Sequence, residues 1–432
     1  MTARTPGVAV LAAALPFLFL HLDYQPGLTV HGIGIEASDV AILAVAVAAL
    51  VAGRRLGFAP LRGALPLWLA AGAFLVWIAI RLVTVGDGYP LHQHAISAAK
   101  YFEYALLAVA LPLLARTRAD LRLLGLALLG WAGLATLVGL LQFCGVGIFG
   151  AWPAGWRQPS FLGHGDFAAL EGLALAVGLA LLAFGERGAW WLTGVGALGV
   201  FLAGASTGAA GVFAAALCVL FLSWRSGSFD RRRALAVVGV VALVGVGIVG
   251  LRSNDFDQFA RFLGLRKEQA AATQEVQTYS HHTLLVYVGY RIWREHPATG
   301  AGWLASTDER TYAPVLPAAR AHFPEVPPLG FPSPAHSYGV QNAYVQALSD
   351  LGVVGALTWL AFLGVAVASA VASREPLLGA AGGGALLVAM GLFGAQGFVA
   401  GIPLDALLWL AVGLVARSRV PLAERAVASD LA

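Results

Sequence analysis

The chain has 432 residues, of which 59% are hydrophobic and only 12% are charged. Soluble globular proteins carry about 25% charged residues, so this composition excludes a soluble enzyme and a disordered chain. The net charge is +4, but the sequence has no run of basic residues interleaved with aromatic residues. Nucleic acid is therefore excluded as a partner. The long, continuous apolar runs exclude a β-barrel and predict an all-α polytopic membrane protein.

Twelve apolar segments are candidate membrane helices, because a helix crosses a bilayer with about 20 apolar residues. We interpret the first as a retained span rather than a signal peptide. The sequence therefore predicts transmembrane helices 1–9 within 1–251, an extracytoplasmic loop at 252–341, helices 10–12 within 342–417 and a cytoplasmic tail at 418–432. The segments are 7–22, 39–53, 64–82, 96–115, 122–145, 165–184, 189–204, 207–224, 233–251, 352–372, 376–397 and 402–417.

The arginines predict the orientation of these spans. Sixteen lie at the two termini and in the connections on one face, whereas the short connections on the other face carry only Arg81, Lys100 and Arg157. The positive-inside rule then places both termini in the cytoplasm. The abundance of Arg, Gly and Ala is typical of a GC-rich bacterial genome, so we expect the membrane to be a bacterial inner membrane. All ten histidines fall at the outer face, and short helices are expected in the long loop near 256–272 and 280–296. Any chemistry is expected on that face.

Arginines of the outer face are the first candidate binding residues. Arg157 stands alone between spans five and six, and its planar fork suits a diphosphate. A snorkelling anchor at the headgroup level is the alternative interpretation. Arg291 and Arg294 share a face of an amphipathic segment that lies on the membrane surface. Attraction to anionic headgroups is equally consistent with the loop cluster, which consists of Arg252, Arg261, Arg266, Lys267, Arg291 and Arg294.

His336 closes the long loop and is the candidate catalytic base. A neutral histidine can take a proton from a sugar hydroxyl, so activity is expected to fall below about pH 6.5. A solvated loop histidine is the alternative. We expect no metal and no cofactor, because His281 and His282 are adjacent and no zinc-type spacing is present.

Three stretches carry a resemblance to a known family. Residues 296–302, H-P-A-T-G-A-G, are similar to the P-x-x-G-x-G element of the O-antigen ligase and polymerase superfamily. Residues 342–355, N-A-Y-V-Q-A-L-S-D-L-G-V-V-G, resemble that family's H-N-x-Y-L-x-x-L-x-E-x-G-x-x-G. The stretch from Arg157 to Asp166 is similar to its R-x-x-G-x-x-x-x-N element. Twelve spans with a large loop before the tenth match its architecture.

This resemblance implies a GT-C-like glycosyltransferase that works at the outer face of the plasma membrane. It implies inverting, metal-independent transfer of an oligosaccharide or polysaccharide en bloc from undecaprenyl diphosphate. The acceptor would be the lipid A-core of lipopolysaccharide or another lipid or glycan acceptor at the cell surface, with membrane lipids as further partners. Arginines would hold the diphosphate, with Arg157 matching one of them, and His336 would activate the acceptor hydroxyl.

The chain departs from the family pattern at several positions. Gln341 stands where the family has the histidine directly before Asn342, and Thr207 replaces an arginine between Ser206 and Gly208. A family arginine upstream of the proline falls on His282, for which Arg291 or Arg294 could substitute. The additional candidate site residues are His282, Gln341, Asn342, Tyr338 and Asp166.

Three functions compete. A ligase and a polymerase of lipid-linked repeat units would share donor and fold, and would differ in whether the product is one capped acceptor or a ladder of lengths. A lipid-linked oligosaccharide flippase or other transporter would need charged groups in mid-membrane and a quasi-symmetric chain. Most charge here lies at the membrane faces, which favours the transferase.

Overall fold

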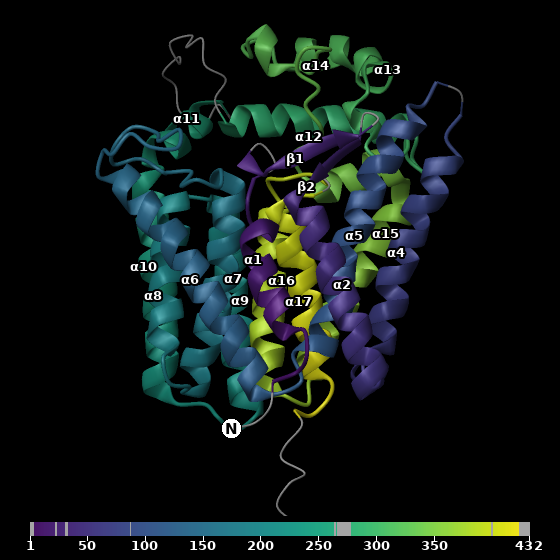
Figure 1. The fold of residues 1–432 in the computed structure, drawn as a ribbon. Helices are drawn as coiled ribbons and strands as arrows, with labels where there is room; N and C mark the ends of the chain where they lie inside the picture. The colour runs from purple at the N-terminus through teal and green to yellow at the C-terminus, as the bar shows by residue number, and fades with distance from the viewer. Residues whose placement is uncertain are drawn as a thin grey trace, which may run out of the picture.

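The computed structural model describes residues 4–21, 24–30, 33–86, 88–262, 265, 278–398 and 401–422. Nearly parallel helices form a bundle, and the long loop covers one end of it (Figure 1). Each of the twelve predicted spans falls on one of these helices. They are α1 (Val8–Leu18), α2 (Ala37–Leu56), α4 (Leu65–Val83), α5 (Leu91–Leu114), α6 (Arg118–Phe143), α7 (His164–Phe184), α8 (Ala189–Ala203), α9 (Ser206–Arg225), α10 (Arg231–Leu251), α15 (Ala343–Val371), α16 (Pro376–Leu392) and α17 (Pro403–Ser418).

Eight of these helices are long and apolar enough to cross a membrane, and α1, α8 and α16 are shorter apolar helices. Their outward faces expose large apolar side chains such as Leu243 and Val246. Exposed apolar faces of this extent are stable only in lipid. The protein is therefore an all-α, multi-pass membrane protein, as the composition predicts.

The first and last described residues lie together at the end of the bundle opposite the long loop (Figure 1). The Thr5 amide donates to Asp120 Oδ1 at 2.9 Å, where α6 begins. Arg417, at the end of α17, donates from Nε to the Ala115 carbonyl at 2.7 Å and from Nη2 to the Arg116 carbonyl at 3.0 Å. The short helix α3 (Ala59–Arg62) lies at the same end. An even number of crossings returns the chain to this side.

Glycines bring α9 and α16 into backbone contact at the centre of the bundle. A Cβ at Gly211 would stand 2.8 Å from the Leu387 carbonyl oxygen, and one at Gly391 would stand 2.6 Å from that of Thr207. Small residues allow this close approach between membrane helices. The contact fixes the position of the outer end of α9, where Ser206 begins the helix.

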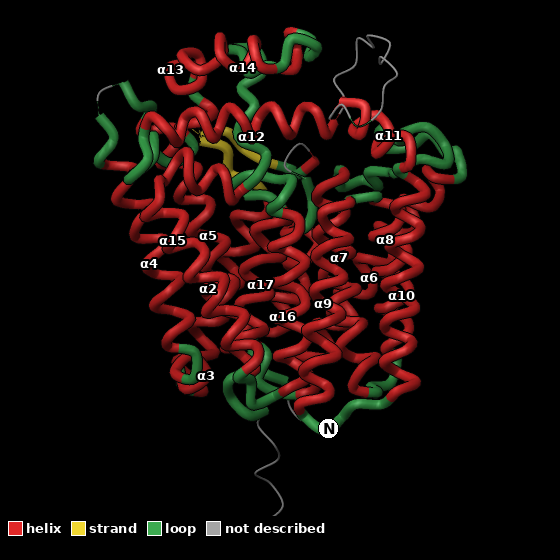
Figure 2. The backbone as a smooth tube through the Cα atoms, turned by 180° about the vertical axis from the view of Figure 1, so that it is seen from behind, coloured by secondary structure: helices red, strands yellow, loops and turns green. Residues whose placement is uncertain are grey.

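The outer layer consists of the long loop and a hairpin. Its helices have a small core of their own, in which Leu285, Val288 and Ile292 of α12 pack with Tyr312 and Phe331. α12 lies across the top of the bundle, with α13 and α14 above it (Figures 1 and 2). The elements are α11 (Ser253–Phe262), α12 (Thr278–Glu295), η2 (Ala305–Thr307), α13 (Glu309–Tyr312), η3 (Ala313–Val315), α14 (Leu316–His322) and η4 (Pro328–Gly330).

The hairpin of β1 (Gly27–Val30) and β2 (Ile33–Glu36) is an addition that the sequence analysis did not predict. The strands are antiparallel, with Val30 opposite Ile33. Four β-branched residues in these short strands favour extended backbone over helix.

The family-like segments 296–302 and 342–355 pack against each other, the first directly after α12 and the second in the first half of α15. α15 contains a break at Gly352, whose φ of 70° is a left-handed conformation. The amides of Val353 and Gly302 donate across the join to the carbonyls of Pro297 and Asp350, at 3.0 Å and 2.8 Å. A Cβ at Gly352 would stand 2.3 Å from the Ala298 carbonyl oxygen. A Cβ at Gly300 would likewise stand 2.4 Å from the Asp350 carbonyl oxygen, so Gly300 and Gly352 are required by this backbone packing.

Candidate functional site

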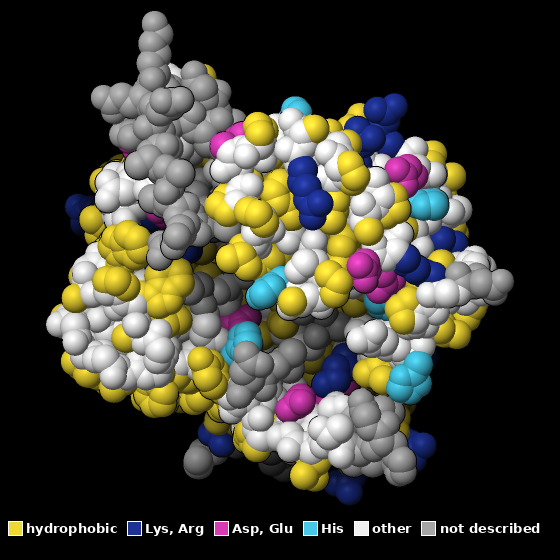
Figure 3. All heavy atoms as spheres, turned by 90° about the horizontal axis from the view of Figure 1, so that it is seen from above, with side chains coloured by type: hydrophobic (Ala, Val, Ile, Leu, Met, Phe, Trp, Pro, Cys, Tyr) yellow, Lys and Arg dark blue, Asp and Glu magenta, His cyan; other side chains and the backbone are white. Residues whose placement is uncertain are grey.

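The outer face of the molecule is hollowed near its middle, and histidine, acidic and basic side chains border the hollow (Figure 3). The candidate residues with which the site can be built come from four places along the chain. These are the α6–α7 connection, the α8–α9 turn, the end of α10 and the beginning of α12.

Gly204, in the turn between α8 and α9, brings two arginines together. Its φ is 62°, and a Cβ there would stand 2.8 Å from the Cβ of Arg157. Its carbonyl accepts a hydrogen bond from Arg252 Nη1 at 3.2 Å. The amide of Gln158 donates to the Leu202 carbonyl at 2.8 Å, which holds the Arg157 segment against the end of α8. Two guanidinium groups that are about 100 residues apart in sequence thus flank one glycine.

Both arginines keep hydrogen-bond donors without partners. The Arg252 side chain is 5% exposed, and its Nε donates to Asp255 Oδ2 at 2.8 Å, but its buried Nη2 has no partner. Arg157 lies over the Trp152 ring, 4.5 Å from the centroid. In the described part of the chain it has no ion pair or hydrogen bond through its side chain. An unpaired buried N–H group on Arg252, beside a half-buried Arg157 whose side chain has no hydrogen bond in the described part of the chain, favours binding of an anion.

The electrostatics of this pair are unfavourable without an anion. Burial, followed by the positive charge of Arg252, lowers the pKa of Arg157 to about 10, against the opposing effects of Asp255 and Tyr279. Each guanidinium therefore destabilises the charged form of the other by electrostatic repulsion. A dianionic group bound between them would relieve this repulsion.

The first turn of α12 adds aromatic and neutral groups to the same cluster. The Tyr279 hydroxyl is 3.1 Å from Ser206 Oγ, and the Tyr279 ring lies beneath Arg252, 4.8 Å from its guanidinium carbon. The pKa of His282 is lowered to about 4, first by burial and then by His281, with smaller effects of both arginines. His282 is therefore neutral near pH 7. We call Arg157, Arg252, Ser206, Tyr279 and His282 the cationic cluster.

His336 lies on a tight turn near this cluster. Its amide donates to the Ser333 carbonyl at 2.9 Å, and its side chain is exposed. Its ring stacks on Tyr338 at 5.9 Å, and Tyr338 meets the edge of His281 at 4.6 Å. Two aromatic contacts thus lead from the exposed His336 through Tyr338 to His281, the neighbour of His282.

The remaining candidates from the family-like motif have structural contacts. Asn342 caps α15, because its Oδ1 accepts from the amides of Tyr344 and Val345 at 3.1 and 3.0 Å, and its Nδ2 donates to the Gly394 carbonyl. The backbone of Gln341 hydrogen-bonds to the His282 ring. Asp166, in the first turn of α7, is buried and lies 3.8 Å from the His21 ring nitrogen.

The loop arginines are not all brought to the cluster. Because α12 rises 1.5 Å per residue, Arg291 lies about 13 Å along the helix from His282 and Arg294 lies further away. Arg266 lies outside the described residues, as does the side chain of Arg261. Among the described residues, no three His, Cys, Asp or Glu side chains are grouped as metal ligands usually are.

A second polar cavity, of about 470 Å³, borders the His336 turn at Pro334 and Ser337. Within its lining, His94 Nε2 lies 3.0 Å from Asp308 Oδ2, and the His94 ring stacks on Tyr89 at 4.7 Å. The sequence analysis missed this pair because its members are 214 residues apart. It also ranked Arg252 with the other loop arginines, although Arg252 directly follows a membrane span, which is the signal that could have singled it out.

Comparisons with known proteins agree with the architecture. A search of curated proteins returns no match. The family model described as O-antigen ligase matches residues 191–360, from the first turn of α8 to the middle of α15. This range contains Ser206, Arg252, Tyr279 and His282 and the family-like segments 296–302 and 342–355, while the stretch from Arg157 to Asp166 precedes it. The chain is therefore a multi-pass membrane protein in which residues 191–360 are similar to the O-antigen ligase family.

Proposed function

We propose that this protein is a glycosyltransferase that moves an oligosaccharide or polysaccharide en bloc from undecaprenyl diphosphate to a cell-surface acceptor. The lipid A-core is one such acceptor. The reaction takes place at the outer face of the bacterial plasma membrane, with both termini in the cytoplasm. The observation that carries the proposal is the pairing of Arg157 and Arg252 at the loop-bearing end of the bundle, with a buried unpaired donor on Arg252.

The two arginines would bind the diphosphate of the donor. A diphosphate offers oxygens on two phosphorus atoms, and a guanidinium fork matches such oxygens better than an ammonium does. Negative charge grows on the diphosphate as the glycosidic bond breaks, so donors fixed around it lower the barrier. Tyr279 and Ser206 supply hydroxyl groups beside the arginines.

The transfer step follows from this arrangement. The acceptor hydroxyl oxygen attacks the anomeric carbon while the bond from that carbon to the diphosphate oxygen breaks. The hydroxyl proton goes to His336, and the leaving undecaprenyl diphosphate stays between the arginines with the bonding electron pair. Attack opposite to the leaving group inverts the anomeric centre, and no metal or cofactor takes part.

A polymerase of lipid-linked repeat units is the second candidate, because it would use the same cluster and the same family similarity supports it. The length distribution of the product separates the two reactions. A transporter would move donor across the membrane without forming a bond.

A transfer assay tests the proposal. Purified protein would be mixed with lipid-diphosphate-linked glycan, acceptor extract and EDTA, with Arg157→Ala, His336→Ala and His94→Ala run beside the wild type. Loss of transfer in the Arg157 and His336 variants supports both roles. If transfer is lost in the Arg157 and His94 variants but not in the His336 variant, the catalytic base is the His94–Asp308 pair rather than His336. Donor movement across proteoliposomes without any new bond would overturn the transferase.

A further inference from the structure

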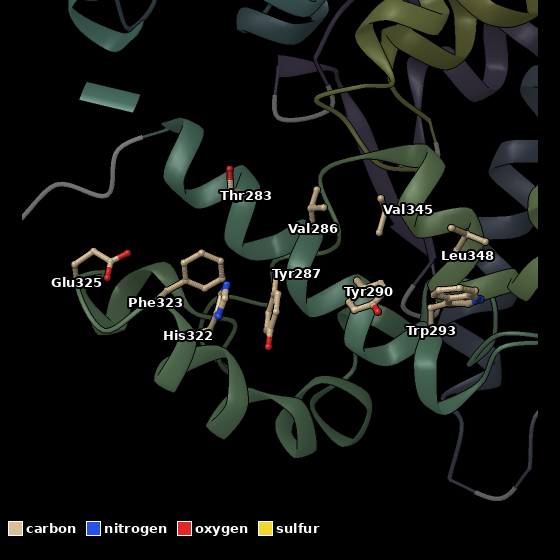
Figure 4. Close-up of a pocket in the computed structure, with 10 residues that line it drawn as sticks. All are labelled: Thr283, Val286, Tyr287, Tyr290, Trp293, His322, Phe323, Glu325, Val345 and Leu348. Carbon is tan, nitrogen blue, oxygen red and sulfur yellow. The ribbon is translucent and has the colours of Figure 1, made fainter. Parts of the chain in front are cut away.

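A groove of about 650 Å³ runs along α12 beside the cationic cluster. Its walls come from α12, from the end of α14 with the segment after it, and from the first turns of α15 (Figure 4). None of the functional assignments above uses it. The lining residues are Thr283, Val286, Tyr287, Tyr290, Trp293, His322, Phe323, Glu325, Val345 and Leu348.

Aromatic rings dominate this lining. Tyr287 and His322 stack face to face at 4.6 Å with an interplanar angle of 4°, and Tyr290 and Trp293 approach to 5.9 Å. Tyr290 is 45% exposed, so its ring is open to a ligand. Thr283 and the exposed Glu325 add hydrogen-bonding groups at the same groove.

This combination matches the chemistry of a sugar ring. A pyranose has an apolar face of C–H groups that packs on an aromatic ring, and hydroxyls at its edge that bond to carboxylates and hydroxyls. A hydrocarbon chain would have no partner for Glu325.

The groove lies along the same face of α12 as Tyr279, a member of the cluster that would bind the diphosphate. Residues 279, 283, 286, 290 and 293 recur at intervals of three and four, so they lie on one face of α12. Tyr279, which contacts Ser206 and Arg252, begins this row, and Trp293 ends it. From Thr283 to Trp293 the helix rises about 15 Å, a length that several linked sugars would occupy.

We propose that this groove binds the glycan of the lipid-linked donor, holding the sugars that follow the diphosphate. The inference rests on the proposed function, because the diphosphate position sets where the glycan begins. It assigns Tyr290 and Trp293 as the residues on which the more distant sugars stack. The expected consequence is a preference for donors that carry several sugars over donors that carry one.

A photo-crosslinking experiment tests the occupant directly. The full chain, with Tyr290→p-benzoylphenylalanine, is irradiated in native membranes that contain the lipid-linked glycan, and the modified peptide is analysed by mass spectrometry. Carbohydrate adducts are expected. The same substitution at Tyr24, an exposed aromatic residue outside the groove, should give none. Acyl or prenyl adducts alone, or no carbohydrate adduct, would overturn the proposal.

Kinetic measurements are a second test, which distinguishes a failure of the proposed glycan site from a failure of the proposed transferase function. Tyr290→Ala should raise the KM for an oligosaccharide donor about fivefold with little change in kcat, while a donor with a single sugar should be unaffected. Tyr290→Phe should restore the wild-type KM. Normal transfer without carbohydrate adducts at position 290 would refute the groove and leave the transferase intact. Carbohydrate adducts without transfer by the wild-type protein would refute the transferase and leave the groove as a glycan site.

Discussion

Replacing Arg252 with methionine tests the paired-arginine site most directly. Methionine keeps an unbranched stem in the buried space and removes the charge and all five N–H donors. In the structure two of the three guanidinium nitrogens are already engaged, Nε with Asp255 and Nη1 with the Gly204 carbonyl. Only the unpaired Nη2 is free to meet a diphosphate.

The expected magnitude follows from that count. One charge-assisted hydrogen bond contributes about 1.5–3 kcal/mol, so losing it should lower kcat/KM by about thirtyfold. Arg157 has no side-chain hydrogen bond or ion pair in the described part of the chain, so its whole fork is available. Arg157→Met should therefore lower kcat/KM more than Arg252→Met does. Removing Arg252 also removes a repulsive charge, which should raise the pKa of Arg157.

The assay is transfer from lipid-diphosphate-linked glycan, with kcat/KM measured for both variants. Arg320→Met serves as the control, because Arg320 is an exposed loop arginine whose guanidinium lies 5.7 Å from the Phe331 ring centroid. It should match the wild type. If Arg252→Met also transferred within twofold of the wild type, Arg252 would be a structural residue and the diphosphate would need other partners.

Three further predictions concern stability. Gly352→Ala should unfold at a clearly lower temperature in detergent, because φ is 70° and the new Cβ would meet the Ala298 carbonyl at 2.3 Å. Gly364→Ala in the same helix meets nothing within 4 Å and should be neutral or stabilising, so equal losses in both would refute this reading. Asn342→Ala should cost about 1–2 kcal/mol through loss of the α15 cap, while Asn342→Asp keeps the acceptor and most of the stability. The folded-state pKa of His282 is lowered to about 4, so the folded protein favours the neutral ring. The contribution of this residue to the free energy of unfolding is therefore complete above about pH 6.5 and is lost as the pH falls toward 4, by at most about 3 kcal/mol. The unfolding temperature of His282→Gln should therefore fall less steeply than that of the wild type between pH 6.5 and pH 4. The same pH dependence in both proteins would contradict this prediction.

The spans could be predicted from the sequence because each is a continuous apolar run, and only a helix satisfies its own backbone in lipid. The tenth helix shows the limit of that signal. It begins at Ala343, nine residues before the predicted boundary, although the intervening residues include polar ones. Asp350 is buried there, where the amide and hydroxyl of Ser306 donate to it at 3.0 and 3.1 Å. Polarity alone suggested a loop, since the partner residues lie more than 40 positions away.

The candidate site could be predicted only in part, for a related reason. Arg157 stands alone in its connection, so the sequence singled it out without any knowledge of its neighbours. Arg252, Arg291 and Arg294 share a loop and a charge, and only the position of Arg252 directly after a membrane span distinguishes it in the sequence. The fold ranks them, because Arg252 ends α10 beside Gly204, whereas Arg291 lies at the far end of α12.

Two departures from the family pattern have a common electrostatic explanation in the cationic cluster. Positions 207 and 282, where the family pattern has arginine, carry threonine and a neutral histidine, and Arg252 approaches from the end of α10 instead. Burial and one neighbouring guanidinium already lower the pKa of Arg157 to about 10. A further buried cation at position 282 would repel both arginines at the cost of folding stability, since no acidic residue other than Asp255 is paired with either of them in the described part of the chain. A neutral His282 thus keeps the charge of the cluster at two, which is the charge that a bound diphosphate can largely neutralise.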